Sequence, residues 1–454
     1  MQNFNNSILS NNEALLLEKE LTEIINEFIW DDEILESAIL HSSIIKLSNK
    51  ILDQAIERNA SAIHLEHLED SLRIRFRIDD VLHPLFQALP KKVIAVIIAR
   101  FKMMADLDIA LESYPQYGII QHIYQECKVD FLIETLPARY GEKIVLRRRY
   151  RSSIILDLDK LITDRESLQL IKAMISHPFG LILVTGAGTS GITTTLYSLL
   201  AELNKPNINI CATSDYLEYS LPGITQVEPI REKGFNFPYI LRTFMRQDPD
   251  VILVDETRCS ETAKTVIEAA ERCLVLTRLH SNDAPSAIAR LDEMGIEPFM
   301  FSHVLIGVIA QRLLRRVCPN CAISYTPTTE ELSHFGTATL PDKITIYKAN
   351  TRKERLAKKS LGNCCFNCDG IGYKGFVGVY QLMPITSRIK TSINRGLTTN
   401  MICQIAEAEG MKTFLDYSLY LVWQKHTTLD EVNRLVQNEY YWSKRRITNT
   451  NKLS

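Results

Sequence analysis

The chain has 454 residues, of which 46% are hydrophobic and 23% charged, and its formal net charge is −2. This length and composition predict a soluble protein of two or three domains, and the near-neutral charge gives no argument for nucleic acid as a partner. No apolar run reaches the ~20 residues of a membrane span, and residues 1–12 lack the features of a signal peptide. We therefore expect a cytoplasmic protein whose ten cysteines are reduced or metal-bound rather than paired.

The first third of the chain is predicted to form the helices and strands of a small mixed α/β domain. Residues 71–79 alternate arginine with apolar side chains, which indicates a strand with one solvated face. A basic cluster at residues 147–151 lies near a predicted domain boundary, and we interpret it as solvated linker. The other elements expected here are helices over residues 1–40, 44–60 and 93–104 and strands over residues 127–134 and 143–149.

A glycine-rich turn joins a buried strand, predicted over residues 181–184, to a helix that opens at Thr193. The spacing Gly186-x4-Gly191-x-Thr193 fits the phosphate-binding loop of nucleotidases, in which backbone N–H groups hold phosphates and a hydroxyl binds Mg²⁺. Ile192 stands where that pattern has a lysine, so the loop lacks a point charge for the β- and γ-phosphates.

The missing lysine predicts ~10–100-fold weaker nucleotide binding and a larger loss of turnover. The alternative is a turn that only connects strand and helix. The residues expected to contact the nucleotide in this loop are Gly186, Gly188, Ser190, Gly191, Ile192, Thr193 and Thr194.

Strands predicted over residues 208–212, 251–254 and 274–279 alternate with helices, which indicates a doubly wound α/β domain. Acids at the carboxyl ends of such strands lie beside bound phosphates, where one carboxylate positions Mg²⁺ or polarises the attacking water. The polar residues that follow these strands are Asp215, Glu218, Asp255, Glu256, Arg258 and His280.

Residues 310–316 are expected to close a helix that runs into two C-x2-C pairs, Cys318 with Cys321 and Cys365 with Cys368. Two such pairs suit a tetrahedral four-cysteine site that holds a structural zinc ion, and the alternative is chance spacing of buried cysteines. A short strand over residues 376–380 precedes a mostly helical stretch over residues 381–436 and a polar end from Ser443. The unpaired cysteines expected in the core are Cys127, Cys211, Cys259, Cys273 and Cys403.

Over residues 38–436 the sequence resembles the ATPases that drive type II secretion and type IV pilus assembly, the GspE and PilB group. The motifs that carry the resemblance are the phosphate-binding loop, residues 60–66, residues 246–250, Glu256 with Arg258, residues 279–283, residues 310–313, the four paired cysteines and residues 372–375. The resemblance implies an α/β protein in which an N-terminal clamp domain closes over a nucleotide bound to a RecA-like P-loop domain. The domains that it implies are a short helical segment (1–37), a PAS-like clamp domain (38–152), a RecA-like domain (153–316), a tetracysteine zinc module (317–380) and a helical C-terminal region (381–454).

The resemblance also assigns roles to single residues. Glu256 matches the expected catalytic base, and His280 matches a histidine of the site. Asp215, Glu218 and Arg258 match residues that surround ATP and Mg²⁺. Besides Ile192, the positions that depart from the family pattern are Ile119, Leu132, Ser214, Asp255, Cys259 and Cys273.

Two functions of different classes follow from these matches and departures. One is a homo-hexameric motor that couples ATP binding and hydrolysis to pilin or pseudopilin assembly at the bacterial inner membrane. The other is a degenerate, non-hydrolysing scaffold or regulatory subunit of the same machinery. The implied partners are an inner-membrane platform protein of the GspF or PilC type and a membrane adaptor of the GspL or PilM type. Because only residues 1–37 precede the clamp domain, we expect adaptor recruitment to be weak or to use a reduced helix.

Overall fold

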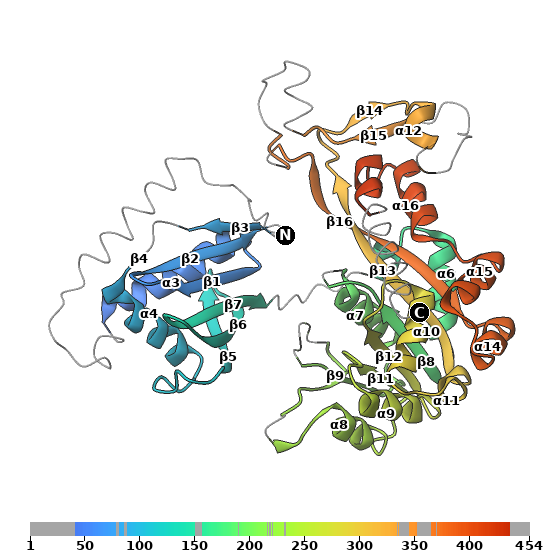
Figure 1. Cartoon of the computed structure of the whole chain (residues 1–454), viewed down its shortest axis with the longest axis horizontal. Coiled ribbons are helices and arrows are strands. Elements are labelled where there is room, and N and C mark those ends of the chain that lie inside the picture. The colour runs from blue at the N-terminus through green and yellow to red at the C-terminus, as the bar shows by residue number, and fades with distance from the viewer. Residues whose placement is uncertain are drawn as a thin grey trace, which may run out of the picture. The chain divides into compact units, whose positions relative to one another are not determined.

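The computed structural model describes residues 41–435, apart from 79–80, 86–88, 150–156, 189, 216, 218, 220, 231–232, 334, 336–344, 352–364 and 369. The chain divides into two compact units, Met1–Ser152 and Ser153–Ser454 (Figure 1). The helix predicted within residues 1–40 and the polar end from Ser443 lie outside the described residues.

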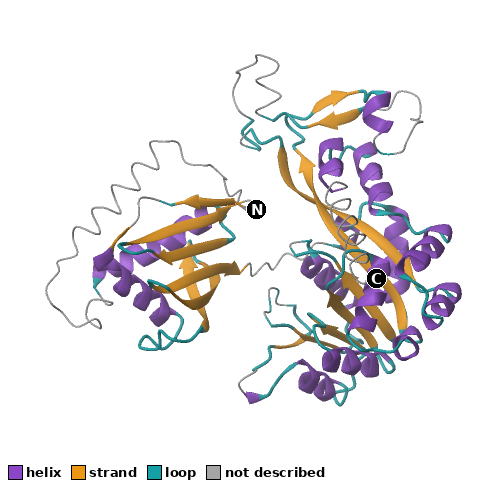
Figure 2. Cartoon of the chain, viewed as in Figure 1, coloured by secondary structure: helices purple, strands orange, loops and turns teal. Residues whose placement is uncertain are grey.

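The described residues of the first unit form an antiparallel sheet with two helices packed against it (Figure 2). Its strands lie in the order β3-β2-β1-β7-β6-β5, and β4 pairs with β2. Leu72, Ile74 and Phe76 of β2 are all buried in the core that also contains the apolar faces of both helices, as their alternation with arginine predicts. The elements are α3 (Ser42–Glu57), β1 (Ala62–His67), β2 (Ser71–Ile78), β3 (Val81–Pro84), β4 (Leu89–Pro90), α4 (Lys91–Met104), β5 (Tyr117–Tyr124), β6 (Cys127–Ala138) and β7 (Gly141–Arg149).

The arginine-bearing face of this sheet is organised around one carboxylate, that of Glu66 on β1. Arg73 and Arg75 on β2 contact it at 2.8 and 2.7 Å, and Lys143 on β7 contacts it at 3.2 Å. Burial raises the pKa of Glu66, but the hydrogen bonds from these three cations outweigh it and lower the pKa to about 2. The arginines are therefore not simply solvated, because two of them are held by an acid on the neighbouring strand.

Replacing Glu66 by glutamine is expected to remove a pH dependence of the stability of the first unit. A carboxyl whose pKa falls from 4.5 to about 2 on folding stabilises the fold above pH 4.5, and this contribution is lost as the pH falls from 4.5 towards 2. We expect the wild type to lose about 2 kcal/mol in that window through this group. Urea unfolding at a series of pH values measures it, with Glu69→Gln, a change at an exposed acid, as the control. An unchanged pH profile in Glu66→Gln would contradict the assignment.

The second unit is built on a seven-stranded sheet in the order β10-β9-β11-β12-β8-β13-β16. All neighbouring strands are parallel except β13 and β16, which are antiparallel. β8, β9 and β11 are buried at every residue, as expected where helices cover both faces of a parallel sheet. The predicted α/β class is therefore confirmed. The strands are β8 (Gly180–Thr185), β9 (Ile210–Thr213), β10 (Thr225–Val227), β11 (Val251–Val254), β12 (Leu274–Leu279), β13 (Leu305–Val317) and β16 (Tyr373–Pro384).

Two helices of the second unit, α5 and α6, precede its first strand, and the others alternate with the strands or continue into the C-terminal part of the chain (Figure 1). A two-stranded sheet, β14 (Ile323–Tyr325) with β15 (Ile346–Lys348), lies between β13 and β16 in the sequence. The helices are α5 (Leu158–Leu161), α6 (Arg165–Ile175), α7 (Ile192–Leu203), α8 (Phe237–Phe244), α9 (Ser260–Ala270), α10 (Ala284–Glu293), α11 (Pro298–Ser302), α12 (Thr329–Ser333), α14 (Ser387–Asn394), α15 (Thr399–Ala408) and α16 (Phe414–Trp423).

Three sequence predictions about secondary structure were wrong. Residues 310–316 belong to β13 rather than to a helix, because pairing with β8 and β16 overrides their helix propensity. Residues 381–384 extend β16 instead of starting the helical region. The linker assigned to residues 147–151 begins with the end of β7, where Arg148 donates to the carbonyl of Ile56 at 3.2 Å. Burial lowers the pKa of Arg148 to about 10, which is not the environment of a solvated linker.

Candidate nucleotide and metal sites

The glycine-rich turn runs from the end of β8 to the start of α7, where Gly191 caps the helix with φ of +80°. A side chain on Gly191 would be strained at that φ and would lie 3.0 Å from Nε2 of Gln311. At Gly186 an added Cβ would lie 2.6 Å from Oγ of Ser190 and would also collide with the carbonyl of Gln311. Gly188 faces open space. The shape of the loop therefore depends on Gly186 and Gly191.

Gln311 on β13 connects the loop to the sheet, whereas the sequence pattern predicts a helix here. Its side chain is 1% exposed, donates to the carbonyl of Ser190 at 2.9 Å and accepts from the hydroxyl of Thr195 at 2.6 Å. A glutamine directly after the apolar run of residues 305–310 was the available signal, because a buried amide needs hydrogen-bond partners. Gln311 thus positions the phosphate-binding loop from the neighbouring strand.

Replacing Gln311 by methionine, which keeps the volume of the side chain, is expected to destabilise the second unit by about 2 kcal/mol. The change removes two buried hydrogen bonds and leaves the hydroxyl of Thr195 without its acceptor. Thermal unfolding measures the loss, with Gln424→Met at an exposed glutamine as the matched control. A Gln311→Met variant as stable as the control would show that the loop keeps its shape without these bonds.

Among the other predicted loop residues, Ser190 offers a hydroxyl to an anionic ligand and Ile192 does not offer a polar group. The hydroxyl of Ser190 is buried, and it has no hydrogen-bond partner within the part of the chain that the structure describes. A phosphate oxygen at the loop would give that hydroxyl an acceptor. Thr193 and Thr194 are half-buried in the first turn of α7, and the Thr194 hydroxyl lies 3.4 Å from that of Tyr219. Ile192, in contrast, is 5% exposed and packs in the apolar core.

Glu256 follows β11 and is surrounded by three cationic or ionisable side chains. Its carboxylate is 2% exposed and lies 2.6 Å from Arg258, 3.3 Å from Arg278 and 2.8 Å from Nε2 of His280. Burial raises the pKa of Glu256, but the hydrogen bond from Arg258 and the charges of Arg278 and His280 leave it below the ordinary value. The carboxylate is therefore ionised at neutral pH and able to accept a proton or a hydrogen bond from water.

Two further acids belong to the same cluster. Asp215 lies 3.9 Å from Arg258. Asp255 accepts from the hydroxyl of Ser214 at 3.0 Å and contacts Arg278 at 3.1 Å. Burial raises the pKa of Asp255 above its ordinary value despite these contacts. Arg278 was not recognised from the sequence, where it is one charge in the apolar run of β12, and Glu218 lies outside the described residues.

The loop and the acid cluster meet at the carboxyl edge of the sheet. Thr185, the last residue of β8, accepts from the backbone N–H of Ser281 at 2.9 Å. Gly186, Ala187 and His280 share the wall of a cavity of about 700 Å³. His280 in turn contacts Glu256, so the structure brings the loop, the predicted base and the predicted histidine together. Such a site fits Mg-ATP, because it offers backbone donors for phosphates, and hydroxyl and carboxylate oxygens for Mg²⁺.

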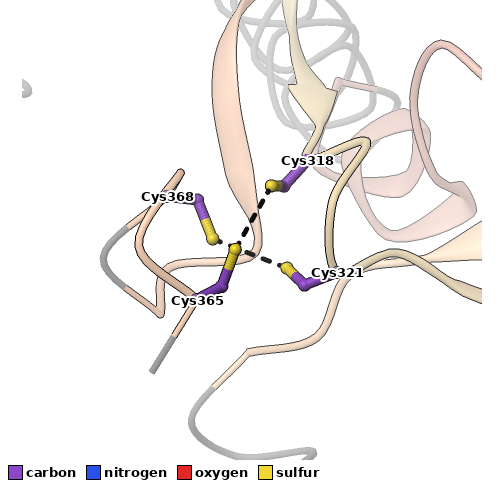
Figure 3. Close-up of side chains that lie close together, drawn as sticks. All are labelled: Cys318, Cys321, Cys365 and Cys368. Carbon is purple, nitrogen blue, oxygen red and sulfur yellow. Dashed lines mark hydrogen bonds between the residues drawn. The ribbon is translucent and has the colours of Figure 1, made fainter. Parts of the chain in front are cut away.

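The four paired cysteines form one cluster, as predicted (Figure 3). Their sulfurs all lie within 4.8 Å of one another, and those of Cys318 and Cys365 are 3.8 Å apart. Four thiolates bound to zinc at ~2.3 Å have sulfurs separated by about 3.8 Å, so the cluster fits a tetrahedral ion. The N–H of Gly372 and the amide of Asn367 donate to sulfurs of the cluster, which favours the thiolate form.

Two of the remaining cysteines contradict the prediction that they lie in the core. Cys127 and Cys259 are exposed, because they stand at the start of β6 and just before α9, where the chain reaches the surface. Cys211 and Cys273 are buried, as predicted, and Cys403 is half-buried.

Residues 38–434 match the protein family described as "Type II/IV secretion system protein". The chain belongs to this family. The type IV pilus assembly ATPase PilB of Myxococcus xanthus is 38% identical over 416 residues, which cover 91% of this chain and 70% of the relative. PilB of Thermus thermophilus is 38% identical over 418 residues but has only 46% of its length covered. A putative type II secretion system protein E of Escherichia coli is 37% identical over 395 residues, 86% of this chain and 76% of the relative.

Two solved structures of ATPases have a fold similar to that of this chain. The pilus retraction motor PilT, solved with bound ADP, matches 85% of this chain and 95% of its own with a TM-score of 0.56 and 23% identity. The ATPase DotB of Yersinia pseudotuberculosis matches 86% of this chain and 93% of its own with a TM-score of 0.61 and 15% identity. Among the described residues of our chain, no helix has the length and apolarity to cross a membrane.

Proposed function

We propose that this chain is a nucleotide-binding subunit of a type II secretion or type IV pilus assembly machine, in which ATP binding and hydrolysis drive the assembly of pilin or pseudopilin subunits. The ionised carboxylate of Glu256, held beside the phosphate-binding loop, is the observation that carries the proposal. The pilus assembly and secretion proteins named above support it, since they resemble this chain over most of its length.

In this mechanism the backbone of Gly186, Gly188 and Gly191 and the N-terminus of α7 would receive the phosphates of ATP. Thr193, with Asp215 or Asp255, would hold Mg²⁺, which supplies positive charge beside the β- and γ-phosphates when bound. Glu256 orients the attacking water and accepts its proton, and His280 and Arg258 hold that carboxylate in place.

The second candidate function is that of a non-hydrolysing subunit of the same machine, and Ile192 favours it. The side chain at the lysine position is directed into the core, so it offers no charge to a phosphate. Arg258 and Arg278 are both already engaged by carboxylates of the site. Each would have to leave an acid to replace the missing lysine.

We further propose zinc as the metal of the cysteine cluster and a ring of six copies as the working assembly. Four thiolates saturate a tetrahedral ion, so this metal has a structural role. The ring would act at the cytoplasmic side of the bacterial inner membrane, with a platform protein of the GspF or PilC type and an adaptor of the GspL or PilM type as partners. The type II secretion and pilus assembly relatives support this placement.

Calorimetric titration with Mg-ATP and a phosphate-release assay test the proposal, with wild type compared to Glu256→Gln. We expect binding in both proteins and release only in the wild type, because glutamine keeps the shape of the site but accepts no proton. Binding without release in the wild type would support the non-hydrolysing subunit. A wild type that does not bind Mg-ATP would overturn the first candidate and leave the non-hydrolysing subunit as a scaffold.

A further inference from the structure

A second cavity, of about 370 Å³, lies beside the cysteine cluster and apart from the nucleotide site. It is formed where the end of β13 and the start of β16 meet β15 and the residues that follow α16. The side chains that give it its chemistry are Arg316, Tyr347, Asn367, Lys374, Lys425 and His426. Its volume falls within the ~300–1,000 Å³ range of small-molecule sites.

The wall of this cavity is basic and contains no carboxylate. Within the described part of the chain, Arg316, Lys374 and Lys425 form no ion pair with an acid. Lys374 donates to the amide oxygen of Asn367 at 3.0 Å, and a guanidinium nitrogen of Arg316 lies 3.4 Å from Nδ1 of His426. Three cations from separate parts of the chain thus lie around a cavity whose wall contains no carboxylate, and their mutual repulsion favours the binding of an anion.

Arg315, which precedes Arg316 on β13, has an acidic partner, so acids are absent from the cavity wall but not from its surroundings. Arg315 binds the buried carboxylate of Glu431 through its guanidinium and stacks over Tyr373 with its Cζ atom 4.2 Å from the ring centroid. Arg316 is exposed, and its side chain belongs to the cavity wall. The charge of Arg315 is therefore neutralised by Glu431, whereas Arg316 lines the cavity without an acidic partner among the described residues.

The backbone at Lys425 gives an independent indication. Lys425 has φ of +64°, in the left-handed region, directly after the C-cap Gln424 of α16. Glycine occupies this position in many helices because it adopts the conformation without strain. A lysine there retains strain while its ammonium group lies 5.3 Å from the ring centroid of Tyr347 in the cavity wall. Lys425 thus keeps its ammonium group at the cavity wall at a backbone position that glycine would occupy with less strain.

We propose that the cavity binds a phosphate group, carried either by a small soluble molecule or by the headgroup of an anionic lipid. The planar guanidinium of Arg316 suits two phosphate oxygens, and the two lysines supply point charges from the opposite elements. The ring of Tyr347 and the amide of Asn367 offer an apolar face and a polar edge to the rest of the ligand. A bound phosphate would link β13, β16 and the end of α16, and would brace the cysteine cluster against the helical region.

The competing explanation is that these cations offset the charge of the four thiolates. Asn367 links the cations to the thiolates. Its amide nitrogen donates to the sulfur of Cys318 at 3.4 Å, and its amide oxygen accepts a hydrogen bond from the ammonium group of Lys374. The two explanations differ in what removal of a cation affects: the affinity for phosphate in one, and the metal content in the other.

Acetylation of lysines in the full-length, zinc-loaded protein, read by mass spectrometry, tests the proposal at the site itself. We expect inorganic pyrophosphate to slow acetylation of Lys374 and Lys425 about tenfold, and to leave Lys264, an exposed lysine on α9, unchanged. Vesicles of phosphatidylglycerol are compared with vesicles of phosphatidylcholine. Protection by pyrophosphate assigns a soluble ligand, and protection only by phosphatidylglycerol assigns a lipid headgroup. Equal rates under all conditions would overturn the proposal.

Lys425→Gly provides the matched variant, because glycine relieves the left-handed strain and so keeps the fold at least as stable. The pyrophosphate concentration that half-protects Lys374 should rise about tenfold in this variant and stay unchanged in Lys264→Ala. Because Lys374 lines this cavity and not the nucleotide site, its protection reports pyrophosphate bound here rather than at the phosphate-binding loop. The measurement does not depend on ATP turnover. Loss of zinc from Lys425→Gly with unchanged protection would show that the cations serve the thiolates instead.

Discussion

Replacing Ile192 by lysine is expected to tighten Mg-ATP binding by about 10–100-fold and to raise the rate of phosphate release by a larger factor, about 10²–10³. The added ammonium group would supply the missing point charge on the β- and γ-phosphates, whose negative charge grows in the transition state. The rest of the site is in place, since Gly186 and Gly191 shape the loop and Glu256 is ionised. Calorimetric titration and a phosphate-release assay measure the two effects.

The same substitution should lower the stability of the second unit. Ile192 is 5% exposed, and removing an isoleucine from the core costs about 1–3 kcal/mol, reduced to the extent that the lysine stem covers the same surface. Ile192→Met is the matched control, because it keeps an apolar side chain of similar volume and adds no charge. We expect it to alter neither binding nor turnover. Equal gains in Ile192→Met and Ile192→Lys would show that loop packing, and not the missing charge, limits the site.

The sequence predicted four strands of the nucleotide domain, β8, β9, β11 and β12, because their apolar runs are short and bounded by polar residues. The bounds of β11 and β12 are those predicted for residues 251–254 and 274–279. The four cysteines were also predictable, since their spacing reflects the geometry of two tight turns facing one ion. Both signals are local: each depends on residues close together in the chain and on one chemical requirement.

The parts that the sequence did not predict depend on which strands become neighbours. Gln311 was placed on a helix, and its role emerges only because β13 pairs with β8 and brings it under the loop. Arg278 joins Asp255 and Glu256 because β12 lies beside β11 in the sheet. Neither residue carries a motif, so periodicity could not separate them from ordinary strand residues. The burial of Ile192 likewise needed the structure, since the lysine position alone does not say where the side chain points.

Zinc is the proposed metal of the cysteine cluster, and its removal is expected to unfold the part of the zinc module that precedes β16 while leaving the seven-stranded sheet folded. The apolar cluster beside the cysteines is small, with Val317, Ala349 and Tyr373 as its buried members among the described residues, whereas Leu332, Phe335 and Ile346 pack in the larger core of the second unit. A core of this size does not offset the conformational entropy of the chain around it. Structural zinc contributes about 10–16 kcal/mol of apparent binding free energy in zinc-finger peptides, so the ion is expected to supply most of the stability here. Metal analysis and limited proteolysis, before and after chelation, measure the change.

Serine substitutions at single cysteines test whether the metal is bound by the four-cysteine cluster. Cys365→Ser should reduce zinc from one ion per chain to a small fraction and expose the module to protease, because three thiolates leave one position of the ion open. Cys127→Ser, at an exposed cysteine of the first unit, is the matched control and should retain the full metal content. The nucleotide site supplies the second control, because Ser190 and Gln311 lie outside the module and should keep their contact. Loss of Mg-ATP binding together with zinc would instead show that the module and the loop form one cooperative unit.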